Sequence, residues 1–130
     1  QNDPNAAYDS LRTVYFNLDQ MPEPDREFLF YRVNQRVYHD GQKRAYLSAL
    51  RHLFPWVKMS QSNLLDQLNQ QTVPTLIIRG EHDPLMGLNA AEGLSKLQPN
   101  SELFNIQGAG HLPHQEKPTQ FIEAVKIWLS

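Results

Sequence analysis

Cysteine is absent from this chain of 130 residues. Its absence excludes disulfide bonds, cysteine-based zinc sites and a thiol nucleophile, but it leaves the cellular compartment open, with the cytoplasm favoured. Long apolar runs are also missing, since no stretch approaches the roughly 20 residues that a membrane-spanning helix needs. We therefore expect no membrane span.

A large excess of charge of either sign is missing as well. Twelve Lys and Arg stand against 14 Asp and Glu, which gives a formal charge of −2. The basic residues form no stripe or cluster, so a nucleic-acid partner is not expected. With 40% hydrophobic and 20% charged residues, the composition is that of a folded globular protein.

The chain divides into two parts by its pattern, at about residue 72. Residues 1–72 read as helical, and residues 73–130 alternate strand and helix. In the first part Asp3 and Pro4 are typical of a helix start, and Pro55 is expected to end a helix. The predicted helices cover about 3–17, 25–39 and 43–54, with a short fourth helix after Ser60 or Ser62.

The second part predicts a strand at 73–78, a helix at about 89–97, a strand at 102–106 and a last helix from Pro118. Strands joined by a helix in this way lie parallel. Because two parallel strands need neighbours on their edges and helices on both faces, this sheet is incomplete. Its other strands must come from an upstream half of the same protein or from a second copy.

Asp83 and His111 follow the two predicted strands directly. Since parallel strands end at the same edge of a sheet, we expect the carboxylate and the imidazole to meet there. A carboxylate that orients a histidine is the arrangement that activates a nucleophile. Gly108 and Gly110 would let the backbone turn tightly beside His111.

These two segments resemble a known family. The run from Val73 to Pro84 is similar to the acid-bearing strand and loop of α/β-hydrolases, and the run from Gly108 to Pro118 is similar to their histidine loop. The resemblance implies an α/β fold of which this chain is the C-terminal portion: a helical cap (lid) at 1–72 and a βαβα unit of the core at 73–130. It is nearest to the carbon–carbon hydrolases and esterases.

The resemblance implies Asp83 and His111 as the acid and the histidine of a catalytic triad, in the chain order nucleophile, acid, histidine. The nucleophile elbow, usually Gly-x-Ser-x-Gly, is missing: only Ser95 follows a glycine by two residues, and it lies in a predicted surface helix. The nucleophile, a serine or an aspartate, is therefore expected outside this chain. The chain alone should be inactive, and no cofactor is implied.

The expected reaction is hydrolysis of an ester, thioester or carbon–carbon bond in a small apolar molecule. Leu85, Met86 and Leu112 are candidate substrate contacts. A metal site formed by His82, Asp83 and His114 is disfavoured by its spacing, and Glu116 is expected to serve the start of the last helix. The alternative function is a non-catalytic module, derived from a hydrolase, that binds a ligand or a protein.

Aromatic residues are frequent in the first part. We expect most of them to form the core of the helical layer, although some could line an apolar pocket. They are Tyr8, Tyr15, Phe16, Phe28, Phe30, Tyr31, Tyr38, Tyr46, Phe54 and Trp56.

Overall fold

The computed structural model describes residues 3–130, so Gln1 and Asn2 of the predicted segment 1–72 lie outside the described residues. Six α-helices, two 3-10 helices and two strands are found in the described part of the chain. In chain order they are α1 (Pro4–Asp9), η1 (Ser10–Thr13), η2 (Leu18–Gln20), α2 (Glu23–Val37), α3 (Asp40–Asn69), β1 (Thr75–Gly80), α4 (Leu88–Leu97), β2 (Ser101–Ile106), α5 (Pro113–Glu116) and α6 (Pro118–Leu129).

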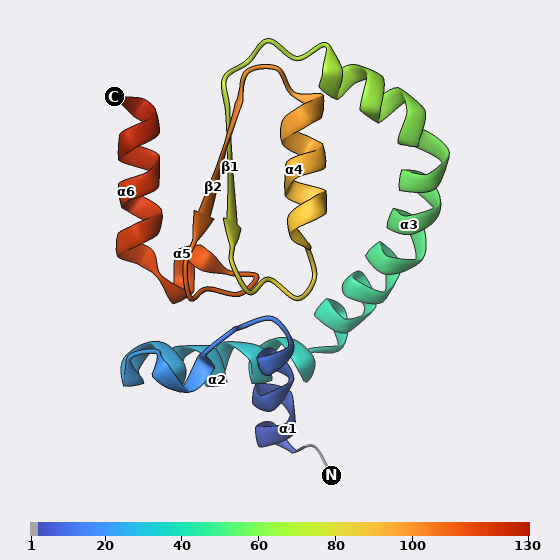
Figure 1. Cartoon of the computed structure of the whole chain (residues 1–130). Coiled ribbons are helices and arrows are strands. Elements are labelled where there is room, and N and C mark those ends of the chain that lie inside the picture. The colour runs from blue at the N-terminus through green and yellow to red at the C-terminus, as the bar shows by residue number, and fades with distance from the viewer. Residues whose placement is uncertain (1–2) are drawn as a thin grey trace.

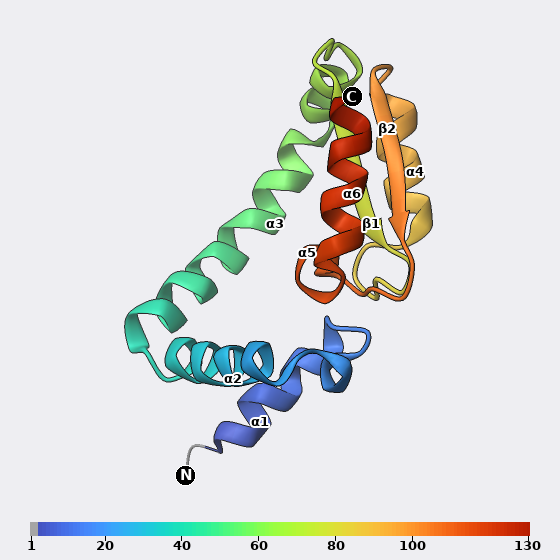
Figure 2. The ribbon, with the colours of Figure 1, turned by 90° about the vertical axis from the view of Figure 1, so that its left-hand side faces the viewer.

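The two strands confirm the predicted strand–helix–strand unit. They pair in parallel, in a register that runs from Thr75 opposite Ser101 to Gly80 opposite Ile106. α4 covers one face of the pair and α6 covers the other (Figures 1 and 2). β1 begins at Thr75 rather than Val73, and it extends through Gly80. The sheet has two strands in the described residues, which agrees with a partial α/β fold.

The first helix is shorter than predicted. Asp3 caps it as expected, since its carboxylate accepts a hydrogen bond from the Asn5 amide at 2.9 Å. The helix ends at Asp9, however, and the chain continues as the 3-10 helix η1. The hydroxyls of Ser10 and Thr13 donate to carbonyls three residues earlier, at 2.7 Å each. Such local bonds compete with the α-helical ones and tighten this turn.

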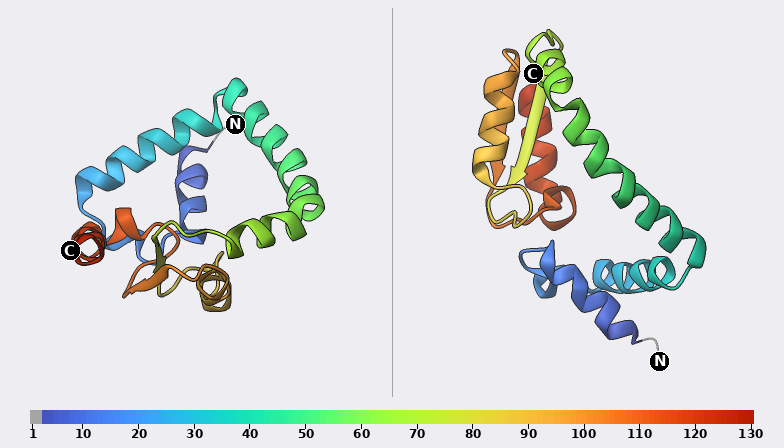
Figure 3. Two further views of the ribbon diagram at one scale, coloured as in Figure 1. Left: turned by 90° about the horizontal axis from the view of Figure 1, so that it is seen from above. Right: turned by 90° about the vertical axis from the view of Figure 1, so that its right-hand side faces the viewer.

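The prediction that Pro55 ends a helix is wrong. α3 runs through it without interruption, and the predicted fourth helix is the C-terminal part of α3. Proline inside a helix removes one backbone hydrogen bond and bends the helix, which a long and solvated helix can tolerate. α3 curves along its length and arches from the end of α2 to the start of β1 (Figures 1 and 3).

The core is divided into two small clusters. One consists of Tyr15, Leu18 and Met21, and the other of Ile106, Ala109 and Ala124. The prediction that most aromatics of the first part are buried is wrong. Tyr15 is buried and Tyr8 is half-buried, whereas the other eight are exposed. Three of the exposed aromatics, Tyr46, Phe54 and Trp56, lie on α3, which arches away from the rest of the chain (Figure 3).

Candidate active site

Both strands point their carboxyl ends toward the layer formed by α1 and α2 (Figures 1 and 2). The loop after β1 carries Asp83, and the loop after β2 carries His111. Backbone hydrogen bonds tie the two loops together: the Glu81 amide donates to the Ile106 carbonyl, and the His82 amide to the Ala109 carbonyl, at 2.9 Å each. Parallel pairing therefore brings the two side chains to one edge of the sheet.

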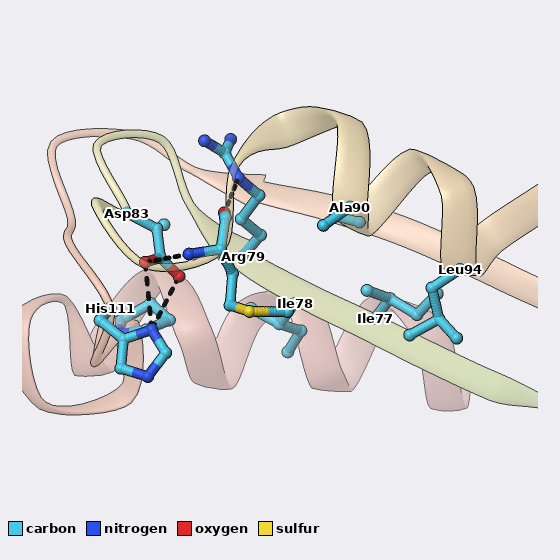
Figure 4. Close-up of a pocket in the computed structure, with 11 residues that line it drawn as sticks. Ile77, Ile78, Arg79, Asp83, Ala90, Leu94 and His111 are labelled. Carbon is cyan, nitrogen blue, oxygen red and sulfur yellow. Dashed lines mark hydrogen bonds and ion pairs between the residues drawn. The ribbon is translucent and has the colours of Figure 1, made fainter. Parts of the chain in front are cut away.

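Asp83 and His111 point toward one another (Figure 4). Nδ1 of His111 lies 2.9 Å from Oδ2 and 3.1 Å from Oδ1 of Asp83. The Asp83 side chain is 6% exposed, and that of His111 is 34% exposed. An ionised carboxylate can only accept hydrogen bonds, so Nδ1 carries the hydrogen and Nε2 is left as the basic nitrogen.

The loop itself holds the carboxylate of Asp83. Oδ1 accepts hydrogen bonds from the amides of Leu85 at 2.8 Å and Met86 at 3.0 Å. Burial raises the pKa of Asp83, but the hydrogen bonds from Met86, His111 and Leu85 outweigh it, so the pKa lies below its ordinary value of 3.8. Asp83 is therefore a carboxylate at neutral pH, as an orienting partner of histidine must be.

Arg79 is a feature that the sequence reasoning missed. Its buried guanidinium donates to the carbonyls of Glu81 at 3.0 Å and Met86 at 3.2 Å, and to Oδ1 of Asn105 at 3.1 Å. The first two contacts bracket the loop that carries Asp83. No motif indicated this role, because the two acceptors that flank the Asp83 loop are backbone carbonyls, which any residue provides.

The histidine loop is held from the N-terminal side of the chain. Gly108 adopts a φ of 65°, the left-handed conformation that glycine was expected to supply. The His111 amide donates to the Val14 carbonyl at 2.8 Å. Next to it, Tyr15 donates its hydroxyl to Gln115, and burial, reinforced by the charge of Glu116, raises the pKa of Tyr15 to about 12.

Glu116 does not serve the start of the last helix. α6 has no side-chain cap, and the carboxylate of Glu116 instead accepts hydrogen bonds from the amides of Gly110, Phe16 and Asn17. The reason is geometric. Glu116 is the last residue of α5, and its side chain meets the amides of the histidine loop and of residues 16–17.

The three candidate substrate residues lie in different environments. Met86 lines a cavity of about 200 Å³ together with Asp83 and His111. Leu85 is 57% exposed and lies outside that lining. Leu112 packs against the cluster of Tyr15, Leu18 and Met21. No ligand contact tests these three assignments, which stay predictions.

The other histidines near the site make contacts of their own. The ring of His82 stacks on Phe16, with ring centroids 3.8 Å apart, and His114 meets the ring of Phe121 edge-on. Within residues 3–130, no three His, Asp or Glu side chains gather as metal ligands would.

In the same range, no helix is long and apolar enough to cross a membrane.

Ser95 lies far from the imidazole of His111 along the sheet. It is a half-buried residue of α4, not a fully exposed one, and its hydroxyl accepts a hydrogen bond from Ser101, the first residue of β2. His111 follows the last residue of that strand. Ser95 therefore belongs to the opposite edge of the sheet.

Comparisons with known proteins agree with the fold. A family model described as alpha/beta hydrolase fold matches residues 4–118. The chloroplastic pheophytinase of Arabidopsis thaliana is 25% identical over 128 residues, which are 98% of this chain and 25% of that protein. The chain thus spans about a quarter of the length of this relative.

Two solved structures show the same fold. The first is a 2-hydroxy-6-oxo-6-phenylhexa-2,4-dienoate hydrolase from Rhodococcus sp. strain RHA1, with a TM-score of 0.74 and 14% identity over 98% of this chain and 44% of that one. The second is a thermophilic esterase, with a TM-score of 0.58 and 26% identity over 98% of this chain and 46% of that one.

Proposed function

This chain belongs to the α/β-hydrolase family, and we propose that it contributes the acid, Asp83, and the histidine, His111, of a nucleophile–histidine–acid triad. The observation that carries the proposal is the contact of 2.9 Å between Nδ1 of His111 and the ionised carboxylate of Asp83 at the carboxyl edge of a parallel sheet. The nucleophile lies on a segment outside these residues, since Gly-x-Ser-x-Gly does not occur among them.

In the proposed reaction Nε2 of His111 takes the proton from the nucleophile, usually a serine hydroxyl, as its oxygen attacks the substrate carbonyl. Asp83 stabilises the imidazolium that forms. His111 then returns the proton to the leaving group when the carbonyl–leaving group bond breaks. Water, deprotonated by the same imidazole, releases the acyl group as an acid and regenerates the enzyme.

The substrate class is an ester, thioester or activated carbon–carbon bond in a small apolar molecule. The wall of the cavity beside the pair supports it, because Ile77, Met86 and Leu94 are apolar. The similar structures include an esterase and a dienoate hydrolase. We further propose that residues 1–72 form a lid, since α1 and α2 lie across the edge where Asp83 and His111 emerge (Figure 1).

The test is fluorophosphonate labelling of the complete protein that carries this chain, read by intact-mass and peptide mass spectrometry. We expect one label, on a serine outside the 130 residues.

His111→Ala should slow labelling and ester turnover by about three orders of magnitude or more, because the nucleophile loses its base. His52→Ala, which removes an exposed histidine of α3, is the matched control and should change neither. The 130-residue chain alone should remain unlabelled.

Each other outcome has a separate meaning. Turnover that depends on His111 without any label indicates an aspartate nucleophile, since fluorophosphonates trap serine. A label on a serine within this chain contradicts the proposal. Neither label nor turnover of an ester and thioester panel by the complete protein favours the non-catalytic binding module.

A further inference from the structure

The carboxylate of Glu116 joins two parts of the chain that lie 100 residues apart in sequence. Its Oε1 accepts a hydrogen bond from the Gly110 amide at 2.8 Å, directly before His111. Its Oε2 accepts one from the Phe16 amide at 2.8 Å, and a longer one from the Asn17 amide at 3.4 Å. One side chain therefore serves the histidine loop and the segment 14–17 at once.

The two backbones that Glu116 joins are in close contact. A Cβ at Gly110 would lie 2.6 Å from both the Phe16 nitrogen and the Val14 oxygen, so this position admits only glycine. Beside it, the His111 amide donates to the Val14 carbonyl at 2.8 Å. The amides of Gly110 and Phe16 therefore lie near each other as two donors without a backbone acceptor. Gly110 is buried, and a buried amide without an acceptor is costly. The carboxylate supplies an acceptor to this amide and to that of Phe16.

We propose that Glu116 is the positioning residue of His111. It does not touch the reacting atoms; it fixes the backbone that carries the imidazole against segment 14–17, and so sets the ring relative to Asp83. This inference rests on the proposed function for its effect on rate, but not for its effect on geometry. The hydrogen bonds are charge-assisted, which makes them stronger and shorter than neutral ones.

Glu116→Gln tests the proposal, since it keeps the side-chain length but replaces one acceptor oxygen by an amide that donates. We expect kcat of the complete protein to fall about tenfold or more while KM stays within about twofold, the size expected when one hydrogen bond to a charged group is lost. Exchange of the Gly110 and Phe16 amides should accelerate by a similar factor. Glu123→Gln on the exposed side of α6 is the matched control and should change none of these quantities.

A spectroscopic readout tests the geometry without turnover. The hydrogen that His111 Nδ1 donates to Asp83 should give a low-field proton resonance, and Glu116→Gln should broaden or remove it. An unchanged resonance together with an unchanged kcat overturns the proposal, even if the amides exchange faster, because Glu116 would then be a structural anchor only.

The failure of the proposed function has a different signature. If the wild-type complete protein turns over no substrate, that function fails, whereas the resonance and the amide exchange still decide the role of Glu116. Should Glu116→Gln not fold, Glu116→Asp retains the charge with a shorter reach, and the same three measurements apply. Normal values of all three in that variant would also count against the proposal.

Discussion

Asp83 illustrates how a single residue can be held by its own loop. The amides of Leu85 and Met86 donate to one oxygen of the carboxylate, and His111 approaches both oxygens. These contacts favour the ionised form over the neutral one, despite burial of the side chain, and so lower its pKa below 3.8. The same contacts link the stability of the fold to pH.

The sign of that linkage follows from the direction of the shift. A carboxylate whose pKa is lowered on folding contributes stability that is fully present above about pH 4, the unfolded value, and is lost as pH falls through the folded value. Asp83→Asn has no carboxyl group to titrate, and we expect it to lower the free energy of unfolding at pH 7. The gap in this free energy between wild type and variant should narrow toward pH 3. Denaturant unfolding of the complete protein and its variant at pH 7 and at pH 3 measures this gap. A gap that is constant with pH would contradict the assignment.

A contact between two side chains could be predicted from the sequence, whereas contacts of side chains with backbone groups could not. The contact between Asp83 and His111 was expected because a carboxylate and an imidazole follow two parallel strands. The role of Arg79 was missed and that of Glu116 was wrongly predicted, since most of their partners are backbone carbonyls and amides. Which backbone groups lack a partner depends on the folded path of the chain, and no sequence pattern records it.

At the scale of elements, the junction of β1 with the histidine loop leaves no room for a side chain at Gly80. A Cβ at Gly80, the last residue of β1, would lie 1.9 Å from the Gly110 carbonyl oxygen and 2.5 Å from that of Ala109. Both neighbours are backbone atoms, so they cannot move aside cheaply. In contrast, a Cβ at Gly93 within α4 would meet nothing within 4 Å apart from the backbone of its own helix turn.

These two glycines make a matched pair. We expect Gly80→Ala to lower the free energy of unfolding by about 3 kcal/mol or more, because the strand and the loop must separate. Gly93→Ala should raise it by about 0.5–1 kcal/mol, since alanine is the better helix former. Chemical denaturation of the complete protein that carries this chain, as wild type and with each substitution, measures the difference. Equal effects of the two substitutions would show that the close packing at Gly80 does not control stability.

Element types were easier to predict than element ends. The strand–helix–strand unit and the last helix follow from apolar periodicity, which tertiary structure did not override. Pro55 misled the prediction because proline is a helix breaker only on average. A helix that is solvent-exposed on most sides, as α3 is between Gln42 and Met59, can bend around the missing hydrogen bond. Whether it bends or ends depends on what it packs against.

On the scale of the whole molecule, much apolar surface lacks a partner among residues 3–130. β1 and β2 pair only with each other, so each has a free outer edge in the described part of the chain. Large apolar side chains on α3 are exposed as well, Leu53 by 50%, Phe54 by 68% and Trp56 by 55%. Exposed strand edges and contiguous apolar surface mark places where further chain or another molecule packs.

The N-terminal half of a hydrolase core and a second copy of this chain would cover that surface in different ways. The comparisons favour the N-terminal half, since this chain covers only 25% of the length of the pheophytinase and 44% of that of the dienoate hydrolase. We expect the 130-residue chain alone to bind a hydrophobic dye and to unfold over a broad range of denaturant. A polypeptide that also carries the upstream core strands should unfold cooperatively at a higher midpoint, because parallel strands gain neighbours and both faces become covered.

Sedimentation velocity at increasing concentration separates the two partners. If the upstream half completes the sheet, the longer polypeptide sediments as a monomer and binds no dye, while the 130-residue chain associates without a fixed stoichiometry. A discrete dimer of the 130-residue chain that excludes the dye and unfolds cooperatively would instead show that a second copy completes the sheet. In that case each site would still need a nucleophile from elsewhere, because the dimer brings together only two copies of Asp83 and His111 and no Gly-x-Ser-x-Gly elbow.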